Sequence, residues 1–150
     1  MIRFLIASHG RLADGFKSTV EVIIGKDVAD KIETVSAFIG ESIEDAKGRL
    51  EAVVKAIPEE DQVIIFSDIM HGSVNQYLMP FVDDERVFLI TGTSFPLVCD
   101  VITQYCFYED AKVDPEELAA AVERAREEII FVNQAMKKEH SEKNEDDFFE

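Results

Sequence analysis

The sequence predicts an α/β fold in which a mostly parallel sheet is covered by helices on both faces. Apolar residues dominate 2–7, where only Arg3 interrupts them, and are consecutive at 63–66 and 87–90. Such runs are typical of parallel strands that are buried on both sides. Apolar residues at helical spacing follow each run. Strands and helices that alternate in this way build a doubly wound sheet through right-handed crossovers.

The first half of the chain predicts two strand–helix units. A strand at 2–7 precedes a helix at 11–24, which Gly25 would end as a C′ residue. A weaker strand at 31–35 precedes a second helix, which begins at the cap residue Ser42 and stops at Pro58. The apolar stripe of this second helix is Ile43, Ala46, Leu50, Val53 and Ile57.

The second half predicts two more strands, at 62–67 and 86–91. Pro80 makes the helix after the first of them short or kinked. Pro96 fits the first turn of the next helix, and Asp114 with Pro115 is a start signal for the last one. The stripe expected on the last helix is Leu118, Val122, Ala125, Ile129 and Val132.

Length and composition predict one domain at 1–138 and an acidic, disordered tail at 139–150. The tail holds six acidic residues and one lysine, a composition that cannot build a core. The whole chain has 150 residues and a formal net charge of -16, which disfavours binding to nucleic acids or to anionic membranes.

The chain is expected to be cytoplasmic. No apolar stretch approaches the roughly 20 residues of a membrane span, and the first residues do not resemble a signal peptide. Cys99 and Cys106 lie about 10 Å apart along a predicted helix, from its rise per residue. That separation is too long for a disulfide, so we expect two reduced thiols.

The candidate site is His9, which stands at the carboxyl end of the first strand. Asp68 ends the third strand in the same way. In the flavodoxin-like strand order 2-1-3-4 these two strands are neighbours at the topological switch point, where such folds bind ligands. Asp68 would then fix the tautomer of the imidazole and stabilise its cation, which leaves the other ring nitrogen as the nucleophile.

An anion cradle is expected beside this pair. Backbone N–H groups at Gly10, Arg11, Gly72 and Ser73 lie near predicted helix starts, where anions bind, and Arg11 adds a positive charge. A nucleophilic imidazole with such a cradle is what phosphoryl transfer to histidine requires. No cofactor and no metal box are predicted.

Other interpretations of these residues remain open at this point. Asp68 and Ser73 could be ordinary helix caps, and His71 could be an exposed loop residue. His9, Asp68 and His71 could bind a metal ion, although their spacing matches no closed metal motif. Ser8 or Ser73 with His9 and Asp68 would imitate a hydrolase triad, but the Gly-x-Ser-x-Gly elbow is absent.

Several segments resemble the mannose-type enzyme IIA family of the bacterial phosphotransferase system. They are FLIASHG at 4–10, the apolar strand that ends in Asp68, the pair Gly72-Ser73 and the stretch GTSFPL at 92–97. The resemblance covers residues 1 to about 135. The sequence departs from the family pattern at His71, Val74 and Ser94, where the family usually has glycine, proline and asparagine.

The resemblance implies a cytoplasmic phosphotransferase that acts in sugar uptake. His9 would accept a phosphoryl group from the histidine-containing phosphocarrier protein and pass it to a sugar-specific IIB protein or domain, with Asp68 as its carboxylate partner. Homodimers are common in the family. At His71 the departure places a second imidazole near the site, which could assist transfer, compete with His9 or bind a metal ion. Two alternative functions stay open, a regulatory module and the phosphocarrier subunit of a dihydroxyacetone kinase.

Overall fold

A computed structural model describes residues 1–38, 40–108 and 110–137. Its sheet has four parallel strands: β1 (Ile2–His9), β2 (Ile32–Ala37), β3 (Gln62–Ser67) and β4 (Val87–Thr91). Their order is β2-β1-β3-β4, so the predicted strand order 2-1-3-4 is confirmed. β1 therefore lies in the middle of the sheet and pairs with both β2 and β3.

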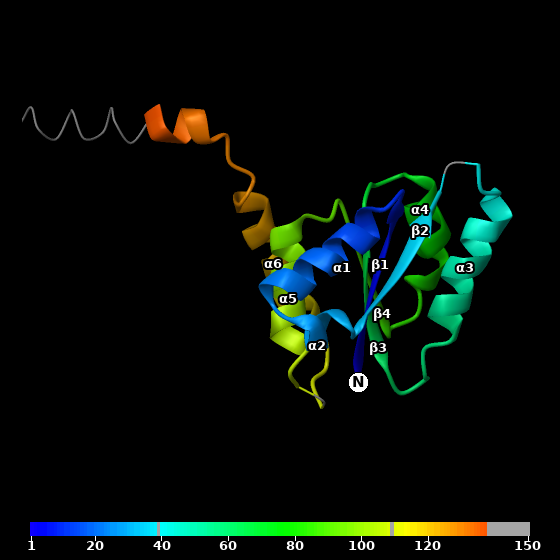
Figure 1. The fold of residues 1–150 in the computed structure, drawn as a ribbon. Coiled ribbons are helices and arrows are strands. Elements are labelled where there is room, and N and C mark those ends of the chain that lie inside the picture. The colour runs from blue at the N-terminus through cyan, green and yellow to red at the C-terminus, as the bar shows by residue number, and fades with distance from the viewer. Residues whose placement is uncertain (39, 109, 138–150) are drawn as a thin grey trace, which may run out of the picture.

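Helices cover both faces of the sheet, as Figure 1 shows. One layer consists of α1 (Leu12–Ile23), α2 (Lys26–Ala29), α5 (Phe95–Tyr105) and α6 (Pro115–Glu127). The other consists of α3 (Ile43–Lys55) and α4 (Ser73–Leu78), which the short 3-10 helix Met79–Phe81 continues. Phe4 and Ile6 of β1 belong to the core under the first layer, and Leu5 and Ala7 to the core under the second. This alternation follows from the period of two along a strand.

The predicted helix boundaries follow from local hydrogen bonds. The Ser42 hydroxyl accepts from the Asp45 N–H at 3.0 Å, and the Asp114 carboxylate accepts from the Glu116 N–H at 2.9 Å. Gly25 has a φ of 135°, and its N–H donates to the Val20 carbonyl at 3.1 Å. These contacts satisfy terminal groups that a helix leaves unpaired.

Three details of the prediction are wrong. β2 runs two residues further, to Ala37, and the short helix α2 was not predicted. α6 ends at Glu127, and a separate helical stretch at 132–137 follows it. Ile129 and Val132 are 79% and 61% exposed, because the chain leaves the sheet after α6 (Figure 1). The expected tail at 139–150 lies outside the described residues.

None of the helices among the described residues is long and apolar enough to cross a membrane. Cys99 and Cys106 are both free, as expected. Burial raises the pKa of each thiol above its ordinary value, which keeps the protonated, weakly reactive form dominant at neutral pH.

Candidate functional site

His9 and Asp68 meet at the carboxyl ends of β1 and β3. Asp68 Oδ2 accepts from the His9 backbone N–H at 2.7 Å and lies 2.9 Å from the His9 ring atom Nδ1. Its other oxygen, Oδ1, accepts from the Ile69 N–H at 2.9 Å. The carboxylate is therefore held from both sides, and it in turn orients the imidazole with the proton on Nδ1.

The second ring nitrogen of His9 faces the hydroxyl of Ser73, the first residue of α4. Nε2 and Ser73 Oγ are 3.0 Å apart. With the proton on Nδ1, the lone pair of Nε2 accepts this hydroxyl hydrogen. The His9 side chain is 44% exposed and Asp68 only 11%, so Nε2 is an oriented nitrogen within reach of a reactant from solution.

Glycine is needed at position 72 because the imidazole of His9 lies close to it, not because the backbone there is strained. Its φ is an ordinary -66°. A Cβ at this position would lie 2.9 Å from His9 Cε1 and 2.5 Å from Ile69 Cγ2. Both distances are shorter than van der Waals contact, so a side chain here would displace the ring or the loop.

The anion cradle is smaller than the sequence predicts. The Gly10 N–H donates to the Ala37 carbonyl at 2.8 Å and the Gly72 N–H to the Ile69 carbonyl at 3.1 Å. These two groups are thus already used within the protein. Within the described parts of the chain, the N–H groups of Arg11 and Ser73 have no partner, and the Arg11 side chain is exposed.

His71 has a backbone φ of 66°, in the left-handed region that favours glycine. The side chain is exposed, and its ring has no hydrogen bond to any described residue, while its carbonyl accepts from Gln76 Nε2 at 2.9 Å. Across 1–38, 40–108 and 110–137, no three His, Cys, Asp or Glu side chains are placed to hold one metal ion. The three-ligand site with His9, Asp68 and His71 is therefore not formed.

His9 lines a crevice of about 540 Å³ between β1, the loop after β2 and helix α4. Its lining residues are His9, Gly10, Ala37, Phe38, Glu41, Ser42, Ala46, Ser73 and Tyr77. Large apolar side chains that follow the same strand ends are about half exposed, namely Leu12, Phe38, Ile69 and Met70. Sequence patterns missed Phe38, Glu41 and Tyr77, since each reads as an ordinary loop or helix residue.

The family model for EIIA-man, described as PTS system fructose IIA component, matches residues 3–122. The chain belongs to this mannose-type IIA family. The PTS system fructose-specific EIIA component of Bacillus subtilis (strain 168) is 27% identical over 104 residues, which cover 69% of this chain and 70% of that protein. The matched region includes His9, Asp68, Gly72 and Ser73.

Two solved structures are similar to this chain over most of their length. One is a Klebsiella pneumoniae protein assigned to the phosphoenolpyruvate-dependent sugar phosphotransferase system, with 30% identity, a TM-score of 0.77 and coverage of 90% of this chain and 93% of that one. The other is the PTS IIA protein associated with the fucose utilization operon of Streptococcus pneumoniae. It has 28% identity and a TM-score of 0.75, and the match covers 90% of this chain and 96% of that chain.

Behind the site, this IIA protein buries a polar contact that sequence reasoning missed. Ser67 Oγ donates to Asn75 Oδ1 at 2.8 Å, and Asn75 is 2% exposed. The Ser67 carbonyl accepts from both the N–H and the hydroxyl of Thr93, at 3.2 and 2.8 Å. These bonds tie α4 and the loop after β4 to the end of β3, directly before Asp68. An asparagine inside a helix gives no signal of such a role.

One of the two hydrolase triads considered from the sequence is formed at the site of this IIA protein. Ser73, His9 and Asp68 have the connectivity of a triad, whereas Ser8 is buried and accepts from the Ala13 N–H at 2.7 Å. However, Ser73 opens a short helix after Gly72 and is not held on a nucleophile elbow.

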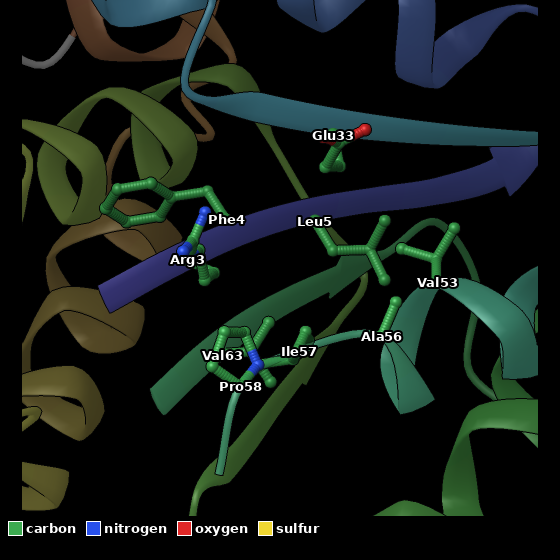
Figure 2. A pocket seen from close by; sticks show the side chains of 9 residues that line it. All are labelled: Arg3, Phe4, Leu5, Glu33, Val53, Ala56, Ile57, Pro58 and Val63. Atoms are coloured by element: carbon green, nitrogen blue, oxygen red, sulfur yellow. The ribbon is translucent and has the colours of Figure 1, made fainter. Parts of the chain in front are cut away.

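A second hollow of about 350 Å³ lies far from His9, between β1, β3 and the end of α3. Figure 2 shows mostly apolar side chains around it, with Arg3 and Glu33 as the charged ones. Arg3 precedes His9 by six residues on β1, which is about 20 Å at the rise of a strand. The hollow therefore belongs to the opposite end of the sheet and contributes nothing to the His9 site.

Proposed function

We propose that this IIA protein is a phosphoryl carrier that is phosphorylated on Nε2 of His9. The donor is the histidine-containing phosphocarrier protein. The bond from phosphorus to the donor nitrogen breaks as the bond to Nε2 forms. The group then leaves for a histidine or cysteine of a IIB protein or domain during sugar uptake. No cofactor takes part in this relay.

The observation that carries this proposal is the hydrogen bond between Asp68 and Nδ1 of His9. Phosphorylation of Nε2 while Nδ1 keeps its proton makes the ring cationic, and an adjacent carboxylate stabilises that cation. The Ser73 hydroxyl lies 3.0 Å from Nε2. Once Nε2 is phosphorylated, this hydroxyl can rotate and donate to a phosphoryl oxygen. Arg11 and the N–H groups of Arg11 and Ser73 would add positive potential around them.

The surface around His9 favours a protein as the donor. The half-exposed side chains of Leu12, Phe38, Ile69 and Met70 offer apolar area that a small phosphorylated metabolite would not cover. The net charge of -16 would also speed encounters with a basic partner surface. A relay between such proteins would take place in the cytoplasm.

A homodimer is the oligomeric state that we propose. Besides the family resemblance, the exposed apolar run Ile129, Ile130, Phe131 and Val132 supports it, because a contiguous exposed apolar surface is typically covered by a partner. Sedimentation equilibrium on the full chain tests this assignment. A monomer mass at micromolar concentration would contradict it.

The carrier function is tested by phosphorylation with phosphoenolpyruvate, the general phosphotransfer enzyme and the phosphocarrier protein. We expect one acid-labile, base-stable phosphoryl adduct in the intact mass spectrum. His9→Ala should lose it completely, because the nucleophile is gone, while the matched control His71→Ala should keep it. An adduct that persists in His9→Ala would disprove the assignment. An adduct that no IIB protein accepts would instead favour a regulatory module.

A further inference from the structure

The carboxylate of Glu41 is a feature of the His9 crevice that phosphoryl transfer alone does not explain. Glu41 lines the crevice together with His9 and Ser73, and its side chain is only 13% exposed. An incoming phosphoryl group carries negative charge, so an unpaired carboxylate on its path would repel it. A crevice that admits an anion therefore needs this charge to be cancelled.

Arg49, on α3, is the cation that pairs with Glu41. Its Nη1 contacts Glu41 Oε1, and its Nη2 donates to Glu41 Oε2 at 3.0 Å. This two-pronged contact is the geometry in which a guanidinium binds a carboxylate most specifically. Nη2 also donates to the Ser36 carbonyl on β2 at 2.5 Å. Arg49 thus joins α3 to the strand that flanks β1.

The same pair fixes the backbone that carries Phe38. Glu41 Oε2 accepts from the Phe38 N–H at 3.1 Å. The preceding residue, Ala37, accepts from the Gly10 N–H at 2.8 Å. Phe38, which is 47% exposed and lines the crevice, is therefore held relative to His9 from two sides. One of these attachments depends on Arg49.

We propose that Arg49 is a positioning residue of the His9 site, which cancels the charge of Glu41 toward the phosphoryl group and fixes Phe38 for the protein that delivers it. The inference rests on the proposed phosphoryl transfer. Arg49 does not line the crevice and so acts through Glu41. Its effect belongs to the capture of the donor, more than to the chemical step.

Removing the charges in turn tests this role. Arg49→Met leaves Glu41 unpaired, and we expect its kcat/KM with the phosphorylated carrier protein to fall about tenfold, mainly through KM. Glu41→Gln with Arg49→Met removes both charges and should recover to within about threefold of the wild type. Arg49→Lys should lie between, because an ammonium keeps the charge without the fork. Lys55→Met, which removes a cation from the same helix but away from the crevice, is the matched control.

Phosphoramidate as a small donor separates the two parts of the role. It needs no docking surface, so Arg49→Met should still react more slowly with it, and the double variant should recover. Circular dichroism and thermal unfolding verify that each variant is folded. Wild-type rates in Arg49→Met with both donors, or a double variant no faster than Arg49→Met, would overturn the inference. A wild type that accepts no phosphoryl group would instead remove the proposed function, and this inference with it.

Discussion

Two aspartates flank β3, and each bonds to an opposite end of β1. Asp61, directly before β3, is 3% exposed and accepts from the N-terminal ammonium at 2.6 Å and from Arg3 Nε at 2.8 Å. Asp68, directly after β3, is 11% exposed and holds His9. The two ends of the same strand pair thus use the same acid with different partners.

The partners decide what each aspartate can do. At the amino end both partners of Asp61 are cations at neutral pH, and they hold the pKa of Asp61 below its ordinary value, first through the hydrogen bond from the N-terminal ammonium and then through the one from Arg3. At the carboxyl end the partner is an imidazole, which can be neutral and has a second nitrogen for a reactant. The amino end of the strand pair is therefore built to hold the strands together, whereas the carboxyl end is equipped to react.

Asp68→Asn should produce the largest difference between the two ends. The amide no longer stabilises a cationic ring, and its NH₂ group favours the opposite tautomer of His9. We expect the rate of phosphoryl acceptance to fall at least about 10- to 100-fold, the range seen when a partner that orients a metal-bound imidazole is removed. Rapid-quench kinetics with the phosphorylated carrier protein measure it. An unchanged rate would mean that Asp68 does not orient His9.

Asp61→Asn is the matched control at the other end of the sheet. It should leave the rate of acceptance unchanged and lower the free energy of unfolding at neutral pH. Because the folded pKa of Asp61 lies below the unfolded value of about 3.9, its stabilisation is present above that pH and is lost as pH falls through the folded pKa. The variant should therefore lose less stability on acidification than the wild type, in urea titrations at several pH values. Equal acid sensitivity would show that Asp61 does not fasten the strands.

His71→Gly should have the smallest effect, and on stability only. A non-glycine residue in the left-handed region costs about 1–2 kcal/mol, and His71→Gly removes this cost. Glycine in turn lowers stability by about 0.5–1 kcal/mol, because it loses more conformational entropy on folding. We expect a gain in stability of about 0.5–1 kcal/mol by these figures, measured by urea unfolding, with phosphoryl acceptance kept. His71→Ala keeps the Cβ and should stay within about 0.5 kcal/mol of the wild type. A collapse of acceptance in His71→Gly would assign the His71 ring a part in transfer.

The fold and the central pair of the site could be predicted because both depend on local patterns. Continuous apolar runs at 4–7, 63–66 and 87–90 are typical of strands that are buried on both faces in a covered parallel sheet. In that sheet the carboxyl ends of neighbouring strands meet at one edge. His9 and Asp68 were thus placed together by topology, without knowledge of any distance.

The remaining features depend on contacts that no local pattern reveals. The N–H groups of Gly10 and Gly72 lie near helix starts, but the turns of the backbone direct them to the carbonyls of Ala37 and Ile69. Glu41, in the loop before α3, pairs with Arg49 eight residues further on, a spacing that matches none of the i,i+3 or i,i+4 pairs by which a helix is recognised. Ile129 continues the helical spacing of α6, and this spacing does not indicate that the helix ends at Glu127.

The exposure of His9 limits the lifetime of the phosphorylated form in the proposed relay. Because 44% of the side chain is open to solvent, water would have access to the proposed phosphohistidine between transfers. A phosphohistidine in such a place slowly hydrolyses, and each hydrolysed group wastes one molecule of phosphoenolpyruvate. The yield of the relay would then depend on how soon the next protein arrives. An open site of this kind suits a partner that is abundant or already bound.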